Sequence, residues 1–257
     1  MDKKTYEQIY HQLNSIKDIN RLSQEFSIGT GILSNIFHQK TVQAVKKYHY
    51  QVVRKAPDML NSWRKGDTLL EIAQKHNFPA VLITSIILKE MGHKSKAIIK
   101  NPYLLQDLRL RNEVLQAMDN DFHYSPKAHA MQSMLGKMGE DIIHEWLIDC
   151  DIDFITESEM SNTQNTKTPD FLLHEPLTIN GIPIKWVESK AVFADEREHN
   201  RYHEKQFKFY EELFGTGVVV YWYGLIDDIC PGNYMIIDHT FFENPKYDVK
   251  KLIDSHM

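Results

Sequence analysis

The stretch Lys185-Trp186-Val187-Glu188-Ser189-Lys190-Ala191-Val192 decides how the second half of this 257-residue chain is interpreted. β-Branched and aromatic residues surround its charged residues, and this composition predicts a β-strand. Because side chains alternate between the two faces of a strand, Glu188 and Lys190 are expected on one face. Two interpretations stay open: a solvated ion pair on a surface hairpin, and part of a catalytic site.

A second motif, Thr168-Pro169-Asp170, precedes that strand and adds another carboxylate. The segment between the motifs contains Asn180-Gly181, a strong signal for a two-residue hairpin turn. Asp170 and Glu188 are therefore expected on adjacent antiparallel strands. Carboxylate oxygens suit Mg²⁺ or Mn²⁺, and a bound cation acidifies water and neutralises charge on a phosphodiester. A neighbouring lysine can orient that water or stabilise the developing anion, so the pattern predicts a metal-dependent nuclease site.

Further polar residues flank this hairpin on predicted helices. Glu140 lies on an amphipathic helix before it, where Gly136 and Gly139 would let another element or nucleic acid approach closely. Gln206 and Tyr210 follow it at positions i and i+4, which share one face of a helix. Taken singly, each has an ordinary explanation: a solvated acid, a helix-surface amide and a core aromatic.

In this order the motifs G-x-x-x-E, P-D, E-S-K and Q-x-x-x-Y resemble those of the PD-(D/E)xK nuclease superfamily. A narrower resemblance, to the TPD-motif family, is carried by Lys167-Thr168-Pro169-Asp170-Phe171, Trp186-Val187-Glu188-Ser189-Lys190-Ala191, His199, Gln206-Phe207 and Val220-Tyr221-Trp222-Tyr223-Gly224. The resemblance implies a restriction-endonuclease-like core behind helical DNA-binding modules.

The resemblance also implies roles for single residues. Asp170, Glu188 and Glu140 would hold Mg²⁺ or Mn²⁺ together with the backbone carbonyl of Ser189, and Lys190 would assist the attacking water. Supporting positions near the site would be Gln206, Tyr210 and His199. The implied substrate is DNA, including structured or branched DNA, and a eukaryotic member would have a codanin-like protein partner.

Charge is distributed unevenly along the chain. Residues 1–130 carry 19 Lys and Arg against 12 Asp and Glu, whereas residues 131–257 carry 11 against 23. A basic front half indicates a module that binds a polyanion, and an acidic back half suits a cation site. The alternative is charge that serves solubility alone.

The front half predicts helices. Residues 1–115 show helical spacing and no long alternating strand pattern. A helix-turn-helix pattern covers residues 66–91, where Asn77 ends the first helix and Pro79 opens the second. A similar pattern runs through residues 19–47. The second helix of the clearer unit is strongly apolar, which favours contact with the nucleic-acid backbone over reading of base edges.

Basic residues beside these helices are candidate phosphate contacts, and aromatic residues among them are candidate stacking platforms. The basic residues are Lys46, Lys47, Arg54, Lys55, Arg64, Lys65, Lys89, Lys94, Lys96 and Lys100, and the aromatic ones are Tyr48, His49, Tyr50 and Trp63. A solvated basic face and a protein-interaction module are the alternatives.

The expected fold is α+β, with a helical nucleic-acid-binding region at residues 1–115 and a nuclease-like domain at residues 116–257. That domain should contain a central mixed sheet flanked by helices. Its predicted elements are a helix at about 128–149, strands at 152–157, 170–175 and 183–191, a helix at 197–214, and strands at 217–223 and 234–238.

Several classes of protein are disfavoured. The sequence has neither a run of about 18 apolar residues nor an apolar signal segment at its start. We therefore expect no membrane association and an intracellular location, in nucleus and cytoplasm for a eukaryotic protein and in the cytoplasm otherwise. Cys150 and Cys230 are expected as reduced core thiols.

Rival functions stay open at this stage. One is a non-catalytic nucleic-acid-binding adaptor or complex subunit on a nuclease-derived fold, and another is a helix-turn-helix regulator. A minor alternative is a zinc site, since histidines at i and i+4 can bind zinc; its residues would be Glu198, His199, His203 and Glu204. DNA or RNA as substrate, endo- or exonucleolytic cleavage, and monomer or homodimer are also left open.

Overall fold

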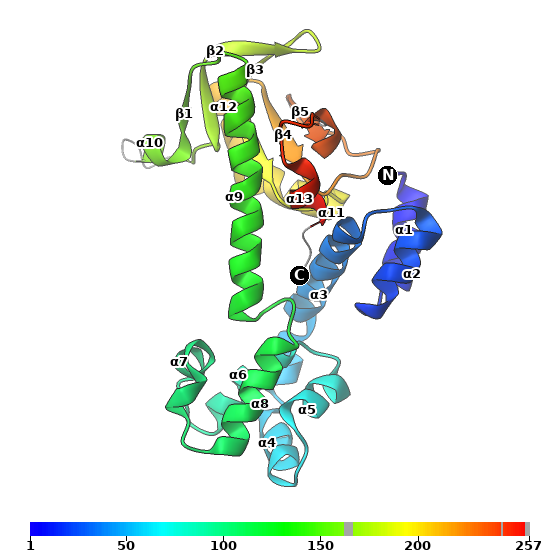
Figure 1. Ribbon diagram of the computed structural model, residues 1–257, viewed down its shortest axis with the longest axis vertical. Helices are drawn as coiled ribbons and strands as arrows, with labels where there is room; N and C mark the ends of the chain where they lie inside the picture. Colours follow the sequence, from blue (N-terminus) through cyan, green and yellow to red (C-terminus); the bar gives the residue numbers. More distant parts are fainter. Residues whose placement is uncertain (162–166, 243, 255–257) are drawn as a thin grey trace. The chain divides into compact units, whose positions relative to one another are not determined.

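The computed structural model describes residues 1–161, 167–242 and 244–254 (Figure 1). These residues form two compact units. The first, here termed the sheet unit, contains residues 1–37 together with the described residues from 134 onward. The second, termed the helical unit, contains residues 38–133.

The first 119 residues are helical, as predicted for residues 1–115. Their elements are α1 (Lys3–Gln12), α2 (Lys17–Phe26), α3 (Thr30–Val53), α4 (Ala56–Arg64), α5 (Leu69–His76), α6 (Ala80–Glu90), α7 (Ser95–Lys100), the 3₁₀ turn η1 (Pro102–Leu104) and α8 (Leu108–Asp119). The domain boundary expected at residue 115 falls inside α8, and it coincides with neither limit of the compact units.

Residues 1–37 belong to the sheet unit because long-range polar contacts hold them there. The Asn35 side chain accepts a 2.8 Å hydrogen bond from the backbone N–H of Phe193. The Tyr6 hydroxyl donates a 2.7 Å hydrogen bond to Asp195. These partners lie more than 150 residues away in the sequence. The compact units are therefore set by tertiary contacts and do not follow chain order.

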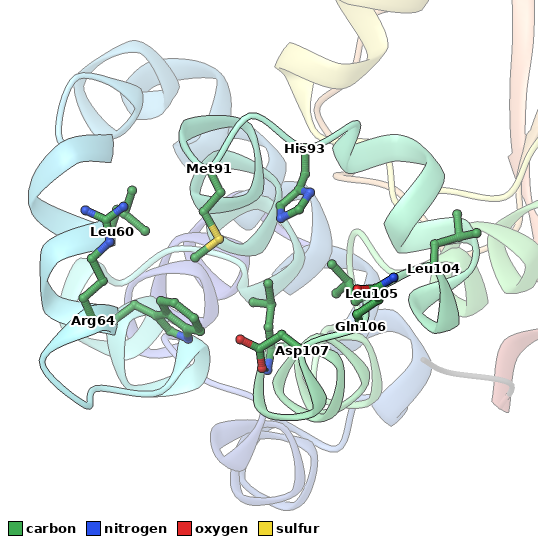
Figure 2. A pocket seen from close by; sticks show the side chains of 10 residues that line it. Leu60, Arg64, Met91, His93, Leu104, Leu105, Gln106 and Asp107 are labelled. Atoms are coloured by element: carbon green, nitrogen blue, oxygen red, sulfur yellow. The ribbon is translucent and has the colours of Figure 1, made fainter.

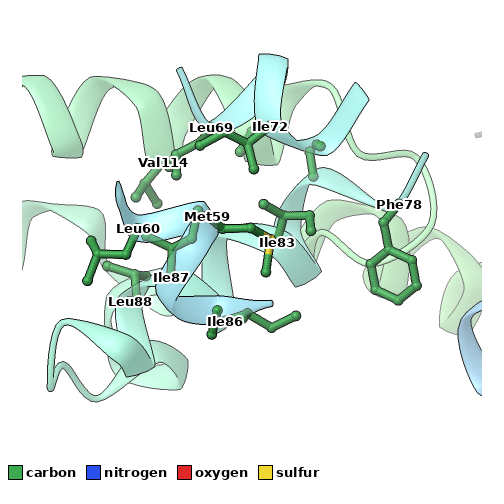
Figure 3. Packing of buried hydrophobic residues seen from close by; sticks show 14 of the residues in the cluster. Met59, Leu60, Leu69, Ile72, Phe78, Ile83, Ile86, Ile87, Leu88 and Val114 are labelled. Carbon is green, nitrogen blue, oxygen red and sulfur yellow. The ribbon is translucent and has the colours of Figure 1, made fainter. Parts of the chain in front are cut away.

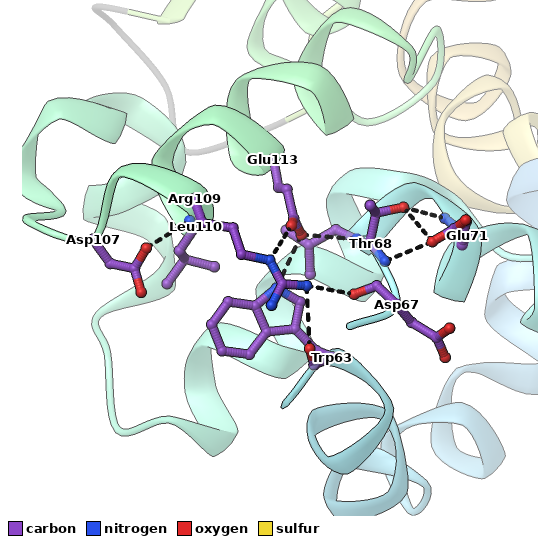
Figure 4. Close-up of polar contacts among 9 residues, drawn as sticks. Trp63, Asp67, Thr68, Glu71, Asp107, Arg109, Leu110 and Glu113 are labelled. Carbon is purple, nitrogen blue, oxygen red and sulfur yellow. Dashed lines mark hydrogen bonds and ion pairs between the residues drawn. The ribbon is translucent and has the colours of Figure 1, made fainter. Parts of the chain in front are cut away.

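Local capping fixes both ends of α5, and the sequence predicted the residue at its C-terminal end, Asn77. The Thr68 hydroxyl accepts from the Glu71 N–H at 3.2 Å, and the Glu71 carboxylate accepts from the Thr68 N–H at 2.7 Å, which together form a capping box (Figure 4). Asn77 ends α5 in the left-handed conformation with φ 47°. Ser27 occupies the equivalent position between α2 and α3 with φ 55°.

Helix α6 supplies much of the core of the helical unit. Figure 3 shows its apolar side chains packed against residues from α4, α5 and α8. The central members of this core are Met59, Leu60, Leu69, Ile72, Ile83, Ile87 and Val114. Each such side chain contributes about 1.5–3 kcal/mol when it is removed from water. A helix buried in this way offers little surface for base edges, in agreement with its apolar sequence.

A buried carboxylate joins three helices of the same unit (Figure 4). Glu113 accepts hydrogen bonds from the Trp63 indole N–H at 2.9 Å, from the Leu69 backbone N–H at 3.1 Å and from the Arg109 guanidinium at 2.8 Å. Three donors, one of them charged, satisfy a carboxylate that burial would otherwise destabilise. Glu113 therefore connects α8 to α4 and to the start of α5.

The sheet unit is built on five strands in the order β1-β2-β3-β4-β5. They are β1 (Phe154–Thr156), β2 (Phe171–Ile179), β3 (Ile182–Lys190), β4 (Gly217–Tyr221) and β5 (Tyr234–Asp238). β1, β2 and β3 pair antiparallel, whereas β4 pairs parallel to β3 and β5 parallel to β4. Asn180 and Gly181, with φ of 49° and 80°, form the predicted turn between β2 and β3. The mixed sheet confirms the predicted α+β class.

Helices and short turns accompany this sheet. They are α9 (Pro126–Asp149), α10 (Glu157–Ser161), α11 (Glu196–Tyr202), the π-helical turn η2 (His203–Phe207), α12 (Lys208–Phe214), the 3₁₀ turn η3 (His239–Phe242) and α13 (Val249–Asp254). The single helix expected at 197–214 is thus interrupted by the π-helical turn. No Gly or Pro marks the break, so the sequence pattern gave no signal for it.

The two faces of β3 pack differently. Ser189 faces α9, where an added Cβ at Gly139 would overlap the Trp222 indole and lie 2.9 Å from the Ser189 hydroxyl. On the opposite face, Trp186 packs edge-on against Tyr210 of α12, with ring centroids 5.3 Å apart. Glu188 and Lys190 share the face of Trp186 because they stand two and four residues beyond it. The alternation predicted for this strand therefore places Ser189 against α9 and Trp186 against α12.

The two cysteines lie at the surface of the protein. Cys150 and Cys230 are free but exposed, so their assignment as core thiols is wrong. Both stand in connections outside the helices and strands, where the chain lies at the surface. None of the helices formed by the described residues combines the length and apolar character needed to span a membrane.

Candidate active site

Reciprocal hydrogen bonds join the two motifs at the end of the β2–β3 hairpin. Phe171 pairs with Val187, which brings Asp170 opposite Glu188. The Asp170 N–H donates to Oε2 of Glu188 at 3.1 Å, and the Ser189 N–H donates to Oδ2 of Asp170 at 2.7 Å. The two carboxylates therefore meet where the hairpin ends, as the sequence predicted.

Lys190 completes this cluster. Its Nζ donates a hydrogen bond to Oε1 of Glu188 and lies 4.9 Å from the centre of the Tyr202 ring. Glu188 is only 1% exposed. A solvated ion pair on a surface hairpin is therefore excluded, because both the carboxylate and its ammonium partner lie inside the unit.

Burial dominates the electrostatics of the cluster. It raises the pKa of Asp170 to about 8, with help from the charge of Glu188 and against the opposing effects of Lys190 and of the Ser189 N–H. Burial likewise raises the pKa of Glu188, although Lys190 opposes the shift. For Lys190, burial acts to lower the pKa, but Glu188 and Asp170 outweigh it, so the pKa is raised. One ammonium thus balances two carboxyl groups that disfavour simultaneous ionisation.

The backbone of Ser189 faces the carboxylates. In a strand the N–H and C=O of one residue point to the same neighbouring strand. Because the Ser189 N–H reaches Asp170, its carbonyl also points to that side. The next carbonyl, of Lys190, accepts from the Trp222 N–H at 3.0 Å on the other side. The Ser189 hydroxyl accepts a 2.8 Å hydrogen bond from the Trp222 indole N–H. The Trp222 indole in turn packs against α9 at Gly139.

Glu140 stands at the edge of this group. It is half-exposed on α9, lies 3.4 Å from the ammonium of Lys137, and its charge contributes to the raised pKa of Asp170. Within the described ranges, no three or more His, Cys, Asp and Glu side chains are arranged to hold a metal ion. The structure therefore brings Asp170 and Glu188 together, and the charge of Glu140 acts on Asp170.

A further acidic residue, Glu157, was missed by sequence reasoning. Its backbone N–H donates to the carbonyl of Asp170 at 3.0 Å, and its charge contributes to the raised pKa of Glu188. Glu157 directly follows β1, which pairs with β2. The sequence could have indicated Glu157, because it is an acidic residue at the end of the predicted strand that neighbours the Asp170 strand.

Tyr210 supports the loop that carries Asp170. Its hydroxyl donates a 2.8 Å hydrogen bond to the carbonyl of Thr168, and burial raises its pKa. Gln206 is half-buried in the π-helical turn η2, whereas Tyr210 lies in α12. The predicted i, i+4 relationship therefore crosses the end of a π-helical turn, a feature that is frequent at functional sites.

His199 is a core residue in this structure. It is 2% exposed, and its ring nitrogens lie 3.0 Å from the Tyr221 hydroxyl and 3.1 Å from the Tyr234 hydroxyl. Burial, together with the charge of His203, lowers the pKa of His199 to about 4, so the ring is neutral near pH 7. His203 bonds the Tyr234 hydroxyl at 3.0 Å. These contacts occupy both ring nitrogens of His199 and one of His203, and they disfavour the zinc alternative.

The basic residues predicted to contact nucleic acid are exposed and belong to the helical unit. They fall in two groups along the chain. The first group comprises Lys46, Lys47 and Arg54 on α3, Lys55 at the start of α4, and Arg64 and Lys65 at its end. The second group comprises Lys89 at the end of α6, Lys94 and Lys96 at the start of α7, and Lys100 at its end.

A cavity of about 500 Å³ also lies in the helical unit (Figure 2). Its lining combines apolar side chains with the polar side chains of Arg64, His93, Gln106 and Asp107. It is lined by Leu60, Trp63, Arg64, Met91, His93, Leu104, Leu105, Gln106, Asp107 and Leu110. None of the carboxylates of the candidate site contributes to it.

Comparisons with known proteins agree with the motifs. A family model described as "Protein of unknown function TPD sequence-motif" matches residues 106–240. The chain is 30% identical over 267 residues to "CDAN1-interacting nuclease 1" of Bos taurus, covering 94% of this chain and 95% of the relative. It is also 30% identical over 255 residues to the Mus musculus protein of that name, covering 89% and 90%.

A shorter similarity extends to a viral protein. "Uncharacterized protein L539" of Acanthamoeba polyphaga mimivirus is 32% identical over 117 residues, which cover 42% of each chain. No solved structure matches this chain. The family model spans more than half of the chain, and the Bos taurus relative is similar over nearly all of it. The chain therefore belongs to the family of proteins that carry the TPD sequence motif.

Proposed function

We propose that this protein is a metal-dependent nuclease that hydrolyses phosphodiester bonds in DNA. The proposal rests on the buried cluster of Asp170, Glu188 and Lys190, which lies where β2 begins and β3 ends. Buried titratable groups with raised pKa values gather preferentially at functional sites. The names of the mammalian relatives, which describe nucleases, support the same reaction class.

The donor atoms fit a hard cation. Asp170, Glu188 and the Ser189 carbonyl offer oxygen ligands only, and oxygen ligands favour Mg²⁺ or Mn²⁺ over softer metals. Burial raises the pKa of both carboxyl groups, and Lys190 opposes that shift, so a bound cation would favour their ionised forms in the same way. Asp170 and Glu188 would hold the cation with the Ser189 carbonyl, and Glu140 would serve as the third carboxylate. A bound cation of this kind supplies Lewis acidity toward water and the phosphodiester.

The protein side chains would then divide the remaining work. In this structure Glu188 holds the ammonium of Lys190 beside the carboxylates. The ammonium of Lys190 would orient the attacking water and stabilise charge that develops on the phosphate. Tyr210 would hold the Thr168 backbone, and with it Asp170, in place. Glu157 would add negative charge beside Glu188 and strengthen its attraction for a cation.

Cleavage of labelled nucleic acids tests this function directly. Single-stranded, duplex and branched DNA and single-stranded RNA would be incubated with Mg²⁺, Mn²⁺ or EDTA, with wild type and Asp170→Ala side by side. Products that require metal and disappear in the folded variant are expected. Nucleic acid that is bound but never cleaved by wild type under any of these conditions would contradict the proposal.

A second candidate function is a non-catalytic adaptor that binds a codanin-like protein. The exposed large side chains beside the cavity in the helical unit favour this alternative. Those exposed side chains are Tyr103, Leu104 and Leu108. The mammalian relatives are named for an interaction with CDAN1, and a codanin-like partner would place apolar side chains on this surface.

Light scattering after size-exclusion chromatography tests the adaptor. A purified codanin-like protein should form a stoichiometric complex with wild type, and Leu104→Asp should weaken it. An unchanged complex would exclude this surface. The same measurement on the protein alone decides between a monomer and a homodimer.

A further inference from the structure

One face of α3 combines free cations with an exposed aromatic ring. Successive α-helical residues are rotated by about 100°, so residues three, four and eight apart share a face. Lys46, Lys47, Tyr50 and Arg54 fall on the same face by this spacing. Val45 and Val52, which are buried, lie on the opposite face. The four residues are here termed the α3 strip, and all four belong to the helical unit.

The cations of the strip are available for an anionic ligand. No Asp or Glu occurs between Glu25 and Asp58. Within the residues that the structure describes, Lys46, Lys47 and Arg54 form no ion pair. Their positive charge is therefore not neutralised inside the protein, and it favours a polyanion.

The ring of Tyr50 is available as well. It is 72% exposed, and the Arg54 guanidinium lies 6.0 Å from its centre, at the outer limit of a cation–π contact. One helical turn, about 5.4 Å, separates the ring from the cations on each side. A base stacked on Tyr50 would thus have cations beside the phosphates on both of its flanks.

This arrangement selects unpaired bases. In a duplex the faces of internal bases are covered by their neighbours, whereas single strands expose them to aromatic side chains. We propose that the α3 strip binds single-stranded nucleic acid, with a base stacked on Tyr50 and adjacent phosphates on Lys46, Lys47 and Arg54. The inference deepens the proposed function by naming its substrate class, and it rests on that function only in requiring a nucleic-acid ligand.

The second basic group lacks this combination. Lys89, Lys94 and Lys96 are exposed, but residues 89–100 contain no Phe, Tyr or Trp, and their exposed ring is the small imidazole of His93. This group therefore adds electrostatic attraction without a large stacking ring. Tyr103 provides a matched control instead, since it is 69% exposed in the same unit with the Arg111 guanidinium 5.6 Å from its ring.

Fluorescence anisotropy with a labelled oligothymidine of about 20 nucleotides tests the strip. The full-length Asp170→Asn protein would be used in EDTA, so that binding is measured without cleavage. Tyr50→Ala should weaken binding roughly 5- to 150-fold, which corresponds to the loss of one stacked base. Tyr50→Phe and Tyr103→Ala should bind like the parent protein. When the logarithm of the association constant is plotted against the logarithm of the salt concentration, Lys46→Ala should make the slope less steep by about 0.7.

Three outcomes would overturn the inference. If Tyr50→Ala binds oligothymidine as tightly as Tyr103→Ala does, stacking on Tyr50 is excluded. Equal weakening of duplex and oligothymidine binding by Tyr50→Ala would assign the strip to duplex DNA. Equal weakening of poly-glutamate and oligothymidine binding would assign it to an acidic protein segment.

Cleavage assays separate this inference from the proposed function. A wild-type protein that binds oligothymidine through Tyr50 but cleaves no substrate would refute the nuclease and leave the strip intact. A metal-dependent nuclease whose oligothymidine binding is indifferent to Tyr50 would refute the strip and leave the nuclease intact.

Discussion

The backbone N–H of Ser189 donates a 2.7 Å hydrogen bond to the carboxylate of Asp170, a residue that stands outside the regular strands. The main chain of β3 thereby holds the carboxylate that the TPD motif contributes. This bond favours the ionised carboxylate, whereas burial and the charge of Glu188 oppose ionisation more strongly. The relationship between these two residues therefore sets both the geometry and the protonation of the candidate site.

Replacing Asp170 by Asn should stabilise the metal-free protein at high pH. The pKa of Asp170 is raised from 3.8 to about 8, so between these values the folded state binds more protons than the unfolded state. Wild-type stability should therefore fall as pH rises through this window, and Asn has no proton to lose. Thermal unfolding in EDTA should show an advantage for the variant that grows until about pH 8 and then levels. A difference in melting temperature between the two proteins that is the same at every pH would contradict the raised pKa of Asp170.

Binding of Mn²⁺ should release protons. Asp170 and Glu188 both have raised pKa values, and a cation requires them ionised. Affinity should accordingly increase with pH up to about pH 8, where Asp170 is half-ionised without metal. Calorimetry in two buffers with different ionisation enthalpies measures the protons released per cation. Asp170→Asn should reduce both the affinity and the number of protons, whereas a pH-independent affinity would argue against these ligands.

Replacing Lys190 by Met should abolish cleavage, leave nucleic-acid binding nearly intact and lower stability. Removal of the ammonium leaves Glu188, which is 1% exposed, without its charged partner. Breaking a buried pair in this way costs about 3–5 kcal/mol. The double variant Glu188→Gln with Lys190→Met removes both charges and should regain most of that stability without regaining cleavage. Urea unfolding and cleavage assays check both effects. Cleavage by the single variant at the wild-type rate would end the assignment of Lys190.

Local signals made the hairpin predictable. Alternation in β3 and the Asn180-Gly181 turn are properties of a few adjacent residues, and they place Asp170 opposite Glu188 without any knowledge of the rest of the chain. The caps of α5 are equally local, since Thr68 and Glu71 bond each other. Elements specified by short-range chemistry could therefore be derived from the sequence.

Other features depend on distant contacts that no local pattern carries. His199 is neutral and buried because Tyr221 and Tyr234, more than 20 residues away, enclose its ring. The grouping of residues 1–37 with the sheet depends on partners near residue 194. The position of Glu140 relative to the other carboxylates depends on how α9 packs, which periodicity alone does not determine.

The packing of α9 gives a paired test on one helix. An added Cβ at Gly139 would overlap the Trp222 indole and lie 2.9 Å from the Ser189 hydroxyl, whereas at Gly136 it would meet nothing within 4 Å. Gly136→Ala should therefore raise stability by up to about 1 kcal/mol through helix propensity. Gly139→Ala should lower it by about 1–3 kcal/mol, because the indole or the helix must move.

Gly136→Ala and Gly139→Ala should also differ in cleavage activity. Movement of Trp222 disturbs its 2.8 Å hydrogen bond to the Ser189 hydroxyl, and the Ser189 backbone holds Asp170. Gly139→Ala should thus lose cleavage activity under conditions where it remains folded, while Gly136→Ala keeps it. Urea unfolding and metal-dependent cleavage would be measured on both. Equal stability and equal activity of the two variants would show that α9 does not approach β3 closely at Gly139, and that the position of Asp170 is independent of this helix.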